Sequence, residues 1–344
     1  VALRPYGDIY AVLAGLPAGT RVMADGATAN SRITEALAHT EWLDRRSPAA
    51  ARKAAKSAGE QAGFRAAHLQ DGAALCRFLY EMKTHPEDFT ELSAGALLHG
   101  LRAARPEFLE DSFGAIVAYG AHGAIVHYGA TEETDVPLRR RGLLLVDSGG
   151  HYRRGTTDVT RTVALGPVTA RERRMATLVL KGHIQLAMAR FPKGVSGENL
   201  DALARMPLWQ EGLDFDHGTG HGVGCVLSVH ESPPSFRWRI VEGIPHPALE
   251  AGMVISDEPG YYEAGQFGIR HENLLMVQED GDDRFLRFEI LTLAPFDRDA
   301  LDAALLTAEE RAWLNGYHRR VYEKIAPLVD AETAAWLRTA TAEI

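Results

Sequence analysis

The sequence predicts an α+β protein in which mostly antiparallel strands are flanked by helices. Three observations support this fold class. Strand-like apolar runs alternate with short glycine-rich turns in the middle and later parts of the chain. Stretches rich in Ala, Leu, Glu, Lys and Arg, which are strong helix formers, come before and after these runs. Two of the turns lie midway between paired apolar runs, as expected for β-hairpins.

The first part of the chain predicts a short unit. Helical spacing covers residues 6–16, a strand fits 21–24, and a helix fits 29–39. These elements are too few to bury a core of their own. We therefore expect residues 1–45 to be the remnant of a preceding N-terminal domain and residues 46–344 to form the main domain.

The main domain begins with helix formers over residues 46–82, and Thr90 is the predicted N-cap of a helix ending at 104. The remaining expected elements are strands over 115–119, 125–128, 143–147 and 158–165, a helix over 170–190 and another after Ser196, strands over 253–258, 267–277 and 285–291, and a helical ending over 308–339.

Composition excludes several classes of protein. The 344 residues include 37 Lys and Arg against 46 Asp and Glu, a net charge of −9, which argues against nucleic acid or an anionic membrane as the main partner. No apolar run approaches the ~18 residues of a membrane span. Cys76 and Cys225 are too few for a disulfide framework and match no CxxC spacing. A cytoplasmic location is expected.

The chain is organised around residues 146–163, VDSGGHYRRGTTDVTRTV. Asp147 ends one apolar run, and Asp158 precedes the next. The two aspartates are equally far from the midpoint of this stretch, so we expect a hairpin closed by residues 151–154 with Asp147 directly opposite Asp158. Opposed Cβ atoms lie roughly 5 Å apart, and two carboxylates that close repel each other unless a cation lies between them. The hairpin therefore predicts one metal ion, or two.

A second hairpin is predicted around Gly265, which lies midway between Glu258 and Glu272. Pro259 holds Glu258 extended at the end of a strand. Alternation places Glu272 on the same strand face as Arg270. The two glutamates should therefore face each other across the hairpin.

The stretch HGTGHGVG contains His217 and His221 among glycines that let the backbone approach other groups closely. It matches neither GxGxxG nor a phosphate loop with a following Lys, so phosphate binding is not expected. A single strand-end carboxylate or loop histidine is usually a solvated turn residue. Four carboxylates converging with one histidine instead supply hard oxygen ligands and one imidazole, a set that suits Mn²⁺ or Zn²⁺ at two adjacent positions.

The segments DSGGHYRRGTTDVTRT, HGTGHGVG followed by VHE, SDEPGYY and GIRHENL resemble the signatures of aminopeptidase P, the Xaa-Pro aminopeptidases among the pita-bread metallopeptidases. The resemblance runs from about Phe64 to the C-terminus, and the ending LTLAPFDRDAL is similar to the long form. It implies the pita-bread (creatinase/aminopeptidase) fold, with residues 46–344 as a catalytic domain that carries a C-terminal helical extension. It also implies cleavage before a penultimate proline by a hydroxide bridging two metal ions.

The resemblance implies a role for each metal ligand. Asp147 would chelate one ion, and His221 and Glu258 would complete the coordination of the other. Asp158 and Glu272 would bridge both ions. Two divalent ions are implied, with Mn²⁺ expected and Zn²⁺ or Co²⁺ as alternatives.

The resemblance also implies the catalytic and substrate-binding residues. Glu258 would accept the proton of the bridging water. His127, His217 and His230 would contact the substrate and stabilise the tetrahedral intermediate. Arg270 would orient a metal-bound carboxylate and belongs with the substrate-binding set.

Two positions depart from the family pattern. Position 257 is Asp where Asn is usual, and position 271 is His where Ile is common. By alternation from Glu258, Asp257 should point away from the metals. The expected partners are peptides with a penultimate proline and a second copy in a homodimer. The chain begins at Val1 and not at Met, and the long form carries two preceding domains, so the resemblance implies a longer polypeptide of about 600 residues, more than one core would organise.

Several other activities compete with this prediction. Prolidase shares the ligand set but cuts only dipeptides. Methionine aminopeptidase fits the GTTDVTRT and EPGYY segments less well, and creatinase shares the fold without metal or the full ligand set. Some relatives kept the fold as non-catalytic peptide-binding modules, but this chain has all five ligands, which favours catalysis.

Overall fold

The computed structural model describes residues 2–240 and 246–344, and the chain divides into two compact units, Val1–Lys53 and Ala54–Ile344. In the first unit, the helices α1 (Asp8–Ala14) and α2 (Ser31–Ala36) accompany the parallel strands β1 (Arg21–Ala24) and β2 (Glu41–Asp44). Leu37 is the single buried side chain among the described residues of this unit, which therefore has hardly any core. The roles predicted for the two parts of the chain stay predictions.

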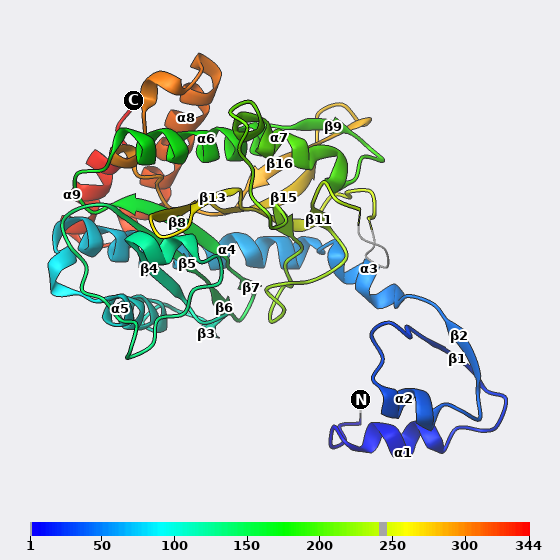
Figure 1. The fold of residues 1–344 in the computed structure, drawn as a ribbon. Helices are drawn as coiled ribbons and strands as arrows, with labels where there is room; N and C mark the ends of the chain where they lie inside the picture. The colour runs from blue at the N-terminus through cyan, green and yellow to red at the C-terminus, as the bar shows by residue number, and fades with distance from the viewer. Residues whose placement is uncertain (1, 241–245) are drawn as a thin grey trace. The chain divides into compact units, whose positions relative to one another are not determined.

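The second unit places helices on both sides of its sheets. In Figure 1, α6 (Ala170–Ala187) and α7 (Gly197–Trp209) lie along one side of the strands, and α4 (Ala58–Thr84) and α5 (Glu91–Ala103) lie along the other. The further described helices of this unit are α8 (Ala308–Ile325), α9 (Ala331–Ala340) and short 3₁₀ turns: η1 (Pro86–Asp88), η2 (Gly120–Ala124), η3 (Arg298–Ala300), η4 (Ala303–Leu305) and η5 (Ala326–Leu328). The helix α3 (Pro48–Ala54) ends at the boundary between the two units.

Antiparallel ladders form every sheet described in this unit, as the sequence predicts. The sheets are β4-β5-β8 (Ile116–Tyr119, Leu143–Ser148, Val159–Ala164), β12-β15-β16-β9 (Val254–Asp257, Asn273–Glu279, Phe285–Ile290, Arg190–Pro192), β3-β6-β7 (Phe108–Asp111, Gly150–Tyr152, Gly155–Thr156), β13-β14 (Gly260–Glu263, Phe267–Arg270) and β10-β11 (Gly220–His221, Ser235–Phe236).

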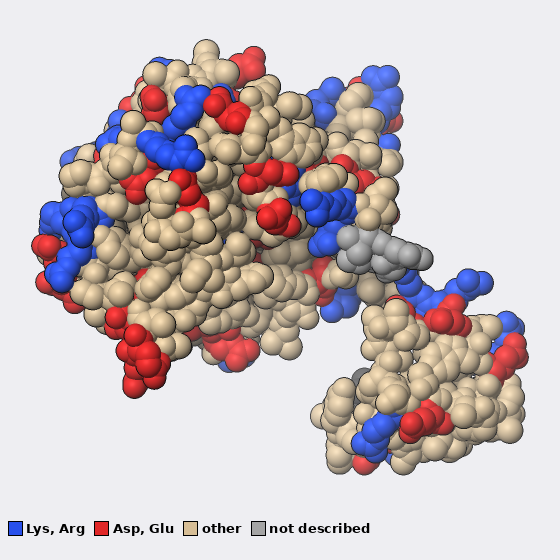
Figure 2. Space-filling model, viewed as in Figure 1, with Lys and Arg blue, Asp and Glu red and all other residues tan. Residues whose placement is uncertain are grey.

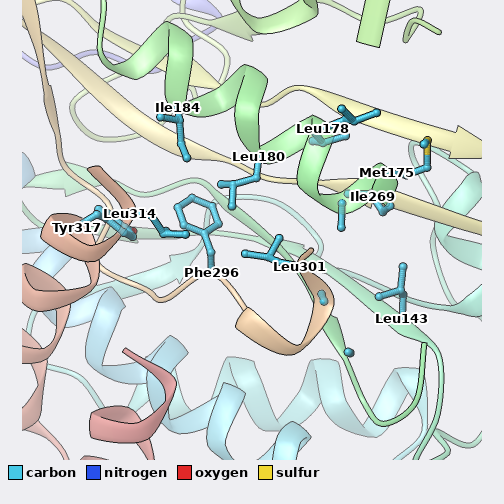
Figure 3. Packing of buried hydrophobic residues seen from close by; sticks show 14 of the residues in the cluster. Leu143, Met175, Leu178, Leu180, Ile184, Ile269, Phe296, Leu301, Leu314 and Tyr317 are labelled. Atoms are coloured by element: carbon cyan, nitrogen blue, oxygen red, sulfur yellow. The ribbon is translucent and has the colours of Figure 1, made fainter. Parts of the chain in front are cut away.

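The core lies on both faces of these sheets. Figure 3 shows Leu180 and Ile184 of α6 directed toward Phe296 and Leu314 from the C-terminal part of the chain. On the other side, residues of α4 and α5 pack against β5. Every residue of β5 and β8 is buried, so Asp147 in β5 and Asp158, directly before β8, lie inside the unit.

Helix capping explains where several helices begin. Thr90 caps α5 through its hydroxyl, which accepts from the Ser93 N–H, and the predicted N-cap is confirmed. Capping boxes of the same kind, in which the third helical residue reaches back, open α4, α6 and α8. These long helices therefore begin at sequence-encoded positions and present their apolar faces to the sheets.

Two predicted strands differ in the structure. Residues 125–128 form no strand, because η2 ends at Ala124 and the Tyr128 N–H then turns back to the Ile125 carbonyl. The run 267–277 is broken into β14 and β15 at residues 271–272. The short strands β2, β3 and β9 were not predicted, because they are only three or four residues long and mostly exposed.

Surface charge is mixed. On the face of the second unit shown in Figure 2, lysines and arginines are interspersed with aspartates and glutamates. Among residues 2–240 and 246–344, the structure contains no helix long and apolar enough to cross a membrane.

Candidate metal centre

The five predicted ligands come from strand ends that meet in the second unit. Asp147 lies in β5, His221 ends β10, and Glu258 follows β12 directly. Asp158 precedes β8, and Glu272 precedes β15. One ligand atom each of Asp158, His221 and Glu272 lies within 4.8 Å of the other two, close enough for one ion to contact all three residues.

His221 presents one ring nitrogen to the carboxylates. Its Nδ1 lies 2.9 Å from the Gly222 carbonyl, to which it can donate a proton, and its Nε2 lies 3.4 Å from Asp158 Oδ2 and 3.5 Å from Glu258 Oε1. A backbone partner on Nδ1 leaves Nε2 available as a metal ligand. Burial lowers the pKa of His221, but Asp158 and Glu258 outweigh burial and raise the pKa to about 9.

Asp147 has one paired and one unpaired oxygen. Its Oδ2 accepts a hydrogen bond from Arg270 Nη2, whereas Oδ1 is buried and has no hydrogen-bond partner among the described residues. A buried carboxylate oxygen without a hydrogen-bond partner lowers the stability of the folded state unless a cation lies next to it. Arg270 also donates to the Tyr262 hydroxyl at 2.8 Å, so the Asp147 side chain is held by a guanidinium that is itself fixed.

The other three carboxylates have raised pKa values, because they are buried and their negative charges repel one another. Burial, reinforced by nearby carboxylates, raises the pKa of Asp158 to about 6 and that of Glu258 to about 7. The pKa of Glu272 is raised well above its ordinary value for the same reasons, although Thr160 Oγ1 donates to its Oε2 at 2.8 Å. Arg270 and His221 alone do not offset four acids, so the donor set and the unpaired Asp147 oxygen fit divalent metal ions.

The first predicted hairpin forms with a different register. β5 pairs with β8 so that Asp147 faces Thr160, and the turn consists of residues 153–154 between Tyr152 and Gly155. The prediction that Asp147 faces Asp158 directly is therefore wrong: Asp158 is a diagonal neighbour. A two-residue shift keeps every side chain on its predicted face, so the two aspartates still point to one site.

The second predicted hairpin is confirmed. Asp257 pairs with Asn273 on one side of the interruption, and Gly260 pairs with Arg270 on the other, which leaves Glu258 facing Glu272 between the two ladders. Gly265 at the tip has a φ of +73°, a conformation that glycine adopts without strain.

Of the three predicted substrate histidines, His230 contacts a predicted metal ligand directly and His217 contacts Tyr262, which binds Arg270. The His230 ring lies perpendicular to the His221 ring, with centroids 4.2 Å apart. His217 Nε2 lies 2.8 Å from the Tyr262 hydroxyl, and burial is the main factor that lowers the pKa of His217 to about 4. His127 is exposed, and its charge acts on both His217 and His230.

Comparison with known families adds a decisive observation. A model of metallopeptidase family M24 matches residues 62–279, and a model of the C-terminal region of peptidase M24 matches residues 284–344. The chain belongs to metallopeptidase family M24. The pita-bread fold of this family, predicted from the motifs, is confirmed.

The M24 relatives support the predicted resemblance to aminopeptidase P. The chain is 43% identical over 311 residues to a probable Xaa-Pro aminopeptidase P of Fusarium vanettenii, which covers 87% of this chain and 50% of that protein. It is 41% identical over 332 residues to aminopeptidase P1 of Lotus japonicus, again covering 87% and 50%. The chain thus spans about half the length of these curated relatives.

Solved M24 structures extend the comparison. The crystal structure of X-prolyl aminopeptidase from Caenorhabditis elegans, described as a cytosolic enzyme with a di-nuclear active site, superposes with a TM-score of 0.90 at 35% identity, over 100% of this chain and 58% of that one. Prolidase from Pyrococcus furiosus gives a TM-score of 0.68 at 23% identity, which shows the shared fold.

Sequence reasoning about this M24 chain missed several residues of the site. Tyr262 links Arg270 to His217, and Ser256 Oγ donates to Glu258 Oε1 at 3.1 Å. Both belong to the SDEPGYY segment, so the motif contained the signal although neither side chain is a metal ligand. A cavity of about 160 Å³ beside His217 was also missed, because its lining comes from distant segments: Arg205, residues 215–218 and residues 237–239.

The two departures from the family pattern occupy the core. Asp257 is buried and faces His183 Nδ1 at 3.2 Å rather than the metal centre, as alternation predicts. His271 is buried, and neither of its ring nitrogens has a hydrogen-bond partner of good geometry among the described residues. Burial lowers the pKa of His271 well below its ordinary value, although a contact with the Ala176 backbone opposes this effect, so the ring is neutral and weakly hydrogen-bonded.

Replacing His271 by isoleucine is expected to stabilise the protein by about 1–2 kcal/mol, because the change replaces a buried, weakly hydrogen-bonded polar ring with an apolar side chain of similar size. Thermal unfolding should show a rise in Tm of roughly 2–4 °C. A lower Tm for the variant would mean that the ring makes polar interactions that it loses.

Proposed function

We propose that this chain is the catalytic part of a metal-dependent Xaa-Pro aminopeptidase, which hydrolyses the bond between an N-terminal residue and a penultimate proline. The observation that carries the proposal is the convergence of three carboxylates on His221, together with a fourth, Asp147, that has a buried unpaired oxygen and interacts electrostatically with Asp158. Identities near 40% to proteins named as Xaa-Pro aminopeptidases support the reaction.

The proposed ligands of two divalent ions are Asp147, Asp158, His221, Glu258 and Glu272. Mn²⁺ is the proposed metal, because carboxylate oxygens dominate the set and one imidazole completes it, with Zn²⁺ or Co²⁺ as alternatives. When bound, the two ions would polarise the scissile carbonyl and lower the pKa of the attacking water.

Glu258 is the proposed general base. Burial raises its pKa to about 7, which suits a group that takes a proton near neutral pH and returns it to the leaving nitrogen. The Ser256 hydroxyl holds Oε1 of this carboxylate, and the His221 N–H in turn holds Ser256 Oγ at 2.9 Å. The base is therefore oriented by the same strand pair that carries a metal ligand.

The proposed substrate contacts are His127, His217 and His230, with Arg270 behind them. A peptide bond to proline has no N–H on its nitrogen, so the site must recognise a ring and a carbonyl oxygen instead of an amide donor. Because burial keeps His217 neutral, this ring can donate one hydrogen bond and accept another without a full charge. Exposed His127 and His230 are free to meet an entering peptide.

Substrate preference tests the function. With Mn²⁺ present, we expect cleavage of Ala-Pro-Ala at least ~100-fold faster than cleavage of Ala-Ala-Ala, a discrimination that recognition of one specific group can supply. Equal rates on both tripeptides would indicate a general aminopeptidase. Cleavage of the dipeptide Ala-Pro but not of Ala-Pro-Ala would favour prolidase, the second candidate, and binding without any hydrolysis would favour a non-catalytic relative.

A cytoplasmic homodimer is proposed on the family resemblance alone. Sedimentation of the purified protein measures its mass in solution, and a monomer at micromolar concentration would contradict the dimer.

A further inference from the structure

Arg161 in β8 is a buried arginine near the metal centre, and none of the site roles predicted above involves it. Four arginines are among the largest fully buried side chains: Arg102, Arg161, Arg205 and Arg270. Three of them pair with carboxylates, namely Asp71, Asp201 and Asp147. Among the described residues, Arg161 has no such ion pair. Burying a charge without a counter-charge is expensive, so its position requires another explanation.

Neutral groups satisfy the Arg161 guanidinium instead. Its Nη1 donates to the carbonyl oxygens of Thr160 at 2.9 Å and Glu272 at 2.6 Å. The other donors reach the carbonyls of Ala294 and Pro295, the Tyr317 hydroxyl and Asn273 Oδ1, while the Phe296 ring lies 4.1 Å from the guanidinium carbon. The charge is therefore fully solvated by the protein, and most of its partners are fixed backbone atoms.

Two of those partners belong to the metal centre. The Thr160 hydroxyl donates to Glu272 Oε2 at 2.8 Å, and the Glu272 N–H donates to the Thr160 carbonyl at 3.1 Å. Arg161 thus binds the main chain of the two residues whose own contacts orient the Glu272 carboxylate. Because Glu272 lies in the break between β14 and β15, the sheet ladder does not fix its backbone.

A second path runs from Arg161 toward Glu258. Asn273 accepts from Arg161 through Oδ1 and contacts His183 Nε2 through Nδ2 at 2.9 Å. The amide Nδ2 can only donate, so His183 Nε2 accepts and His183 carries its proton on Nδ1, which lies 3.1 Å from the Asp257 carbonyl oxygen. Asp257 directly precedes Glu258. Arg161, Asn273, His183 and Asp257 are each at most 1% exposed, so water does not compete for these bonds.

We infer that Arg161 is a positioning residue of the metal centre, which holds Glu272 through its main chain and the backbone next to Glu258 through Asn273 and His183. This inference rests on the proposed metal centre but not on the proposed substrate. A residue with only a packing role would affect folding and leave the metal affinity of the folded protein unchanged.

Mn²⁺ affinity measured calorimetrically in folded protein separates these roles. Arg161→Met should weaken Mn²⁺ binding by 10- to 100-fold, the usual effect of losing a group that orients a ligand, and should lower kcat while KM changes little. Arg161→Lys keeps the charge with fewer donors and should recover part of the affinity. Arg102→Met is the matched control: it removes another fully buried arginine, lowers Tm, and should leave Mn²⁺ affinity within twofold.

The outcomes are distinct. Unchanged Mn²⁺ affinity in folded Arg161→Met, or an equal loss in Arg102→Met, would overturn the inference. If Arg161→Met does not fold, Asn273→Ala replaces it, and at least a threefold loss of Mn²⁺ affinity is expected, with no loss counting against the inference. Wild-type protein that binds Mn²⁺ but cleaves no Xaa-Pro peptide would refute the proposed function and leave this test intact.

Discussion

Replacing Asp158 by asparagine is expected to remove at least one of the two metal ions and to lower peptidase activity more than ~100-fold, beyond the loss that ligand-orienting groups alone cause. Asparagine has almost the same shape, so packing around β8 should survive. The amide is neutral and offers one weaker oxygen, whereas the proposed bridging role needs two anionic oxygens. The neighbouring His221 would also lose the Asp158 carboxylate that lies 3.4 Å from its Nε2.

Metal content by atomic emission and hydrolysis of Ala-Pro-Ala check this expectation together. Asp71→Asn is the matched control, because Asp71 is also buried but pairs with Arg102 and Tyr152 away from the centre. That variant should lose stability, since a buried arginine is left without its partner, and should keep both ions. Full activity of Asp158→Asn with two ions retained would remove Asp158 from the ligand set.

Much of the fold could be predicted because local signals and tertiary packing agree. The strand Arg21–Ala24 and the N-cap at Thr90 are found at the predicted residues. Residues 125–128 show the opposite case. Their apolar side chains suggest a strand, but they follow η2, whose Gly123 packs closely against the Gly268 backbone, and they form a turn instead. A contact between residues so far apart in the chain leaves no local signal.

The site shows the same contrast between local sequence signals and contacts of distant residues. The hairpins and the family resemblance predict five ligands, and the structure brings at least Asp158, His221 and Glu272 together. Symmetry about a midpoint predicts the second hairpin correctly but misjudges the register of the first by two residues, because it places His151 and Tyr152 in the turn, whereas both lie in β6 and the turn consists of residues 153–154. The offset between the two strands is the same on both sides of Gly149, so the error lies in the length of the turn and not in a break of the ladder. Arg161 could not be assigned from sequence, since its partners are mostly backbone oxygens.

Stability of the metal-free protein should depend on pH in a defined direction. Burial, with the nearby carboxylates, raises the pKa of Asp158 from 3.8 to about 6 and that of Glu258 from 4.5 to about 7. Against the effect of burial, those acids raise the pKa of His221 from 6.5 to about 9. In each case the folded state holds its proton more tightly than the unfolded chain. The resulting stability is complete below the unfolded pKa and is lost as pH rises through the folded pKa.

Metal binding should reverse this loss, because the ligands bind metal in their deprotonated forms and protons compete with the ions. The Tm difference between Mn²⁺-loaded and chelator-treated protein should therefore grow from about pH 5 to about pH 8. At about 1.4 kcal/mol per pKa unit, the increase should be on the order of 5 °C. Scanning calorimetry at both pH values measures it, with Asp158→Asn expected to show a smaller increase. A Tm difference that stays constant, or shrinks toward pH 8, would show that these carboxylates and His221 do not share a metal site.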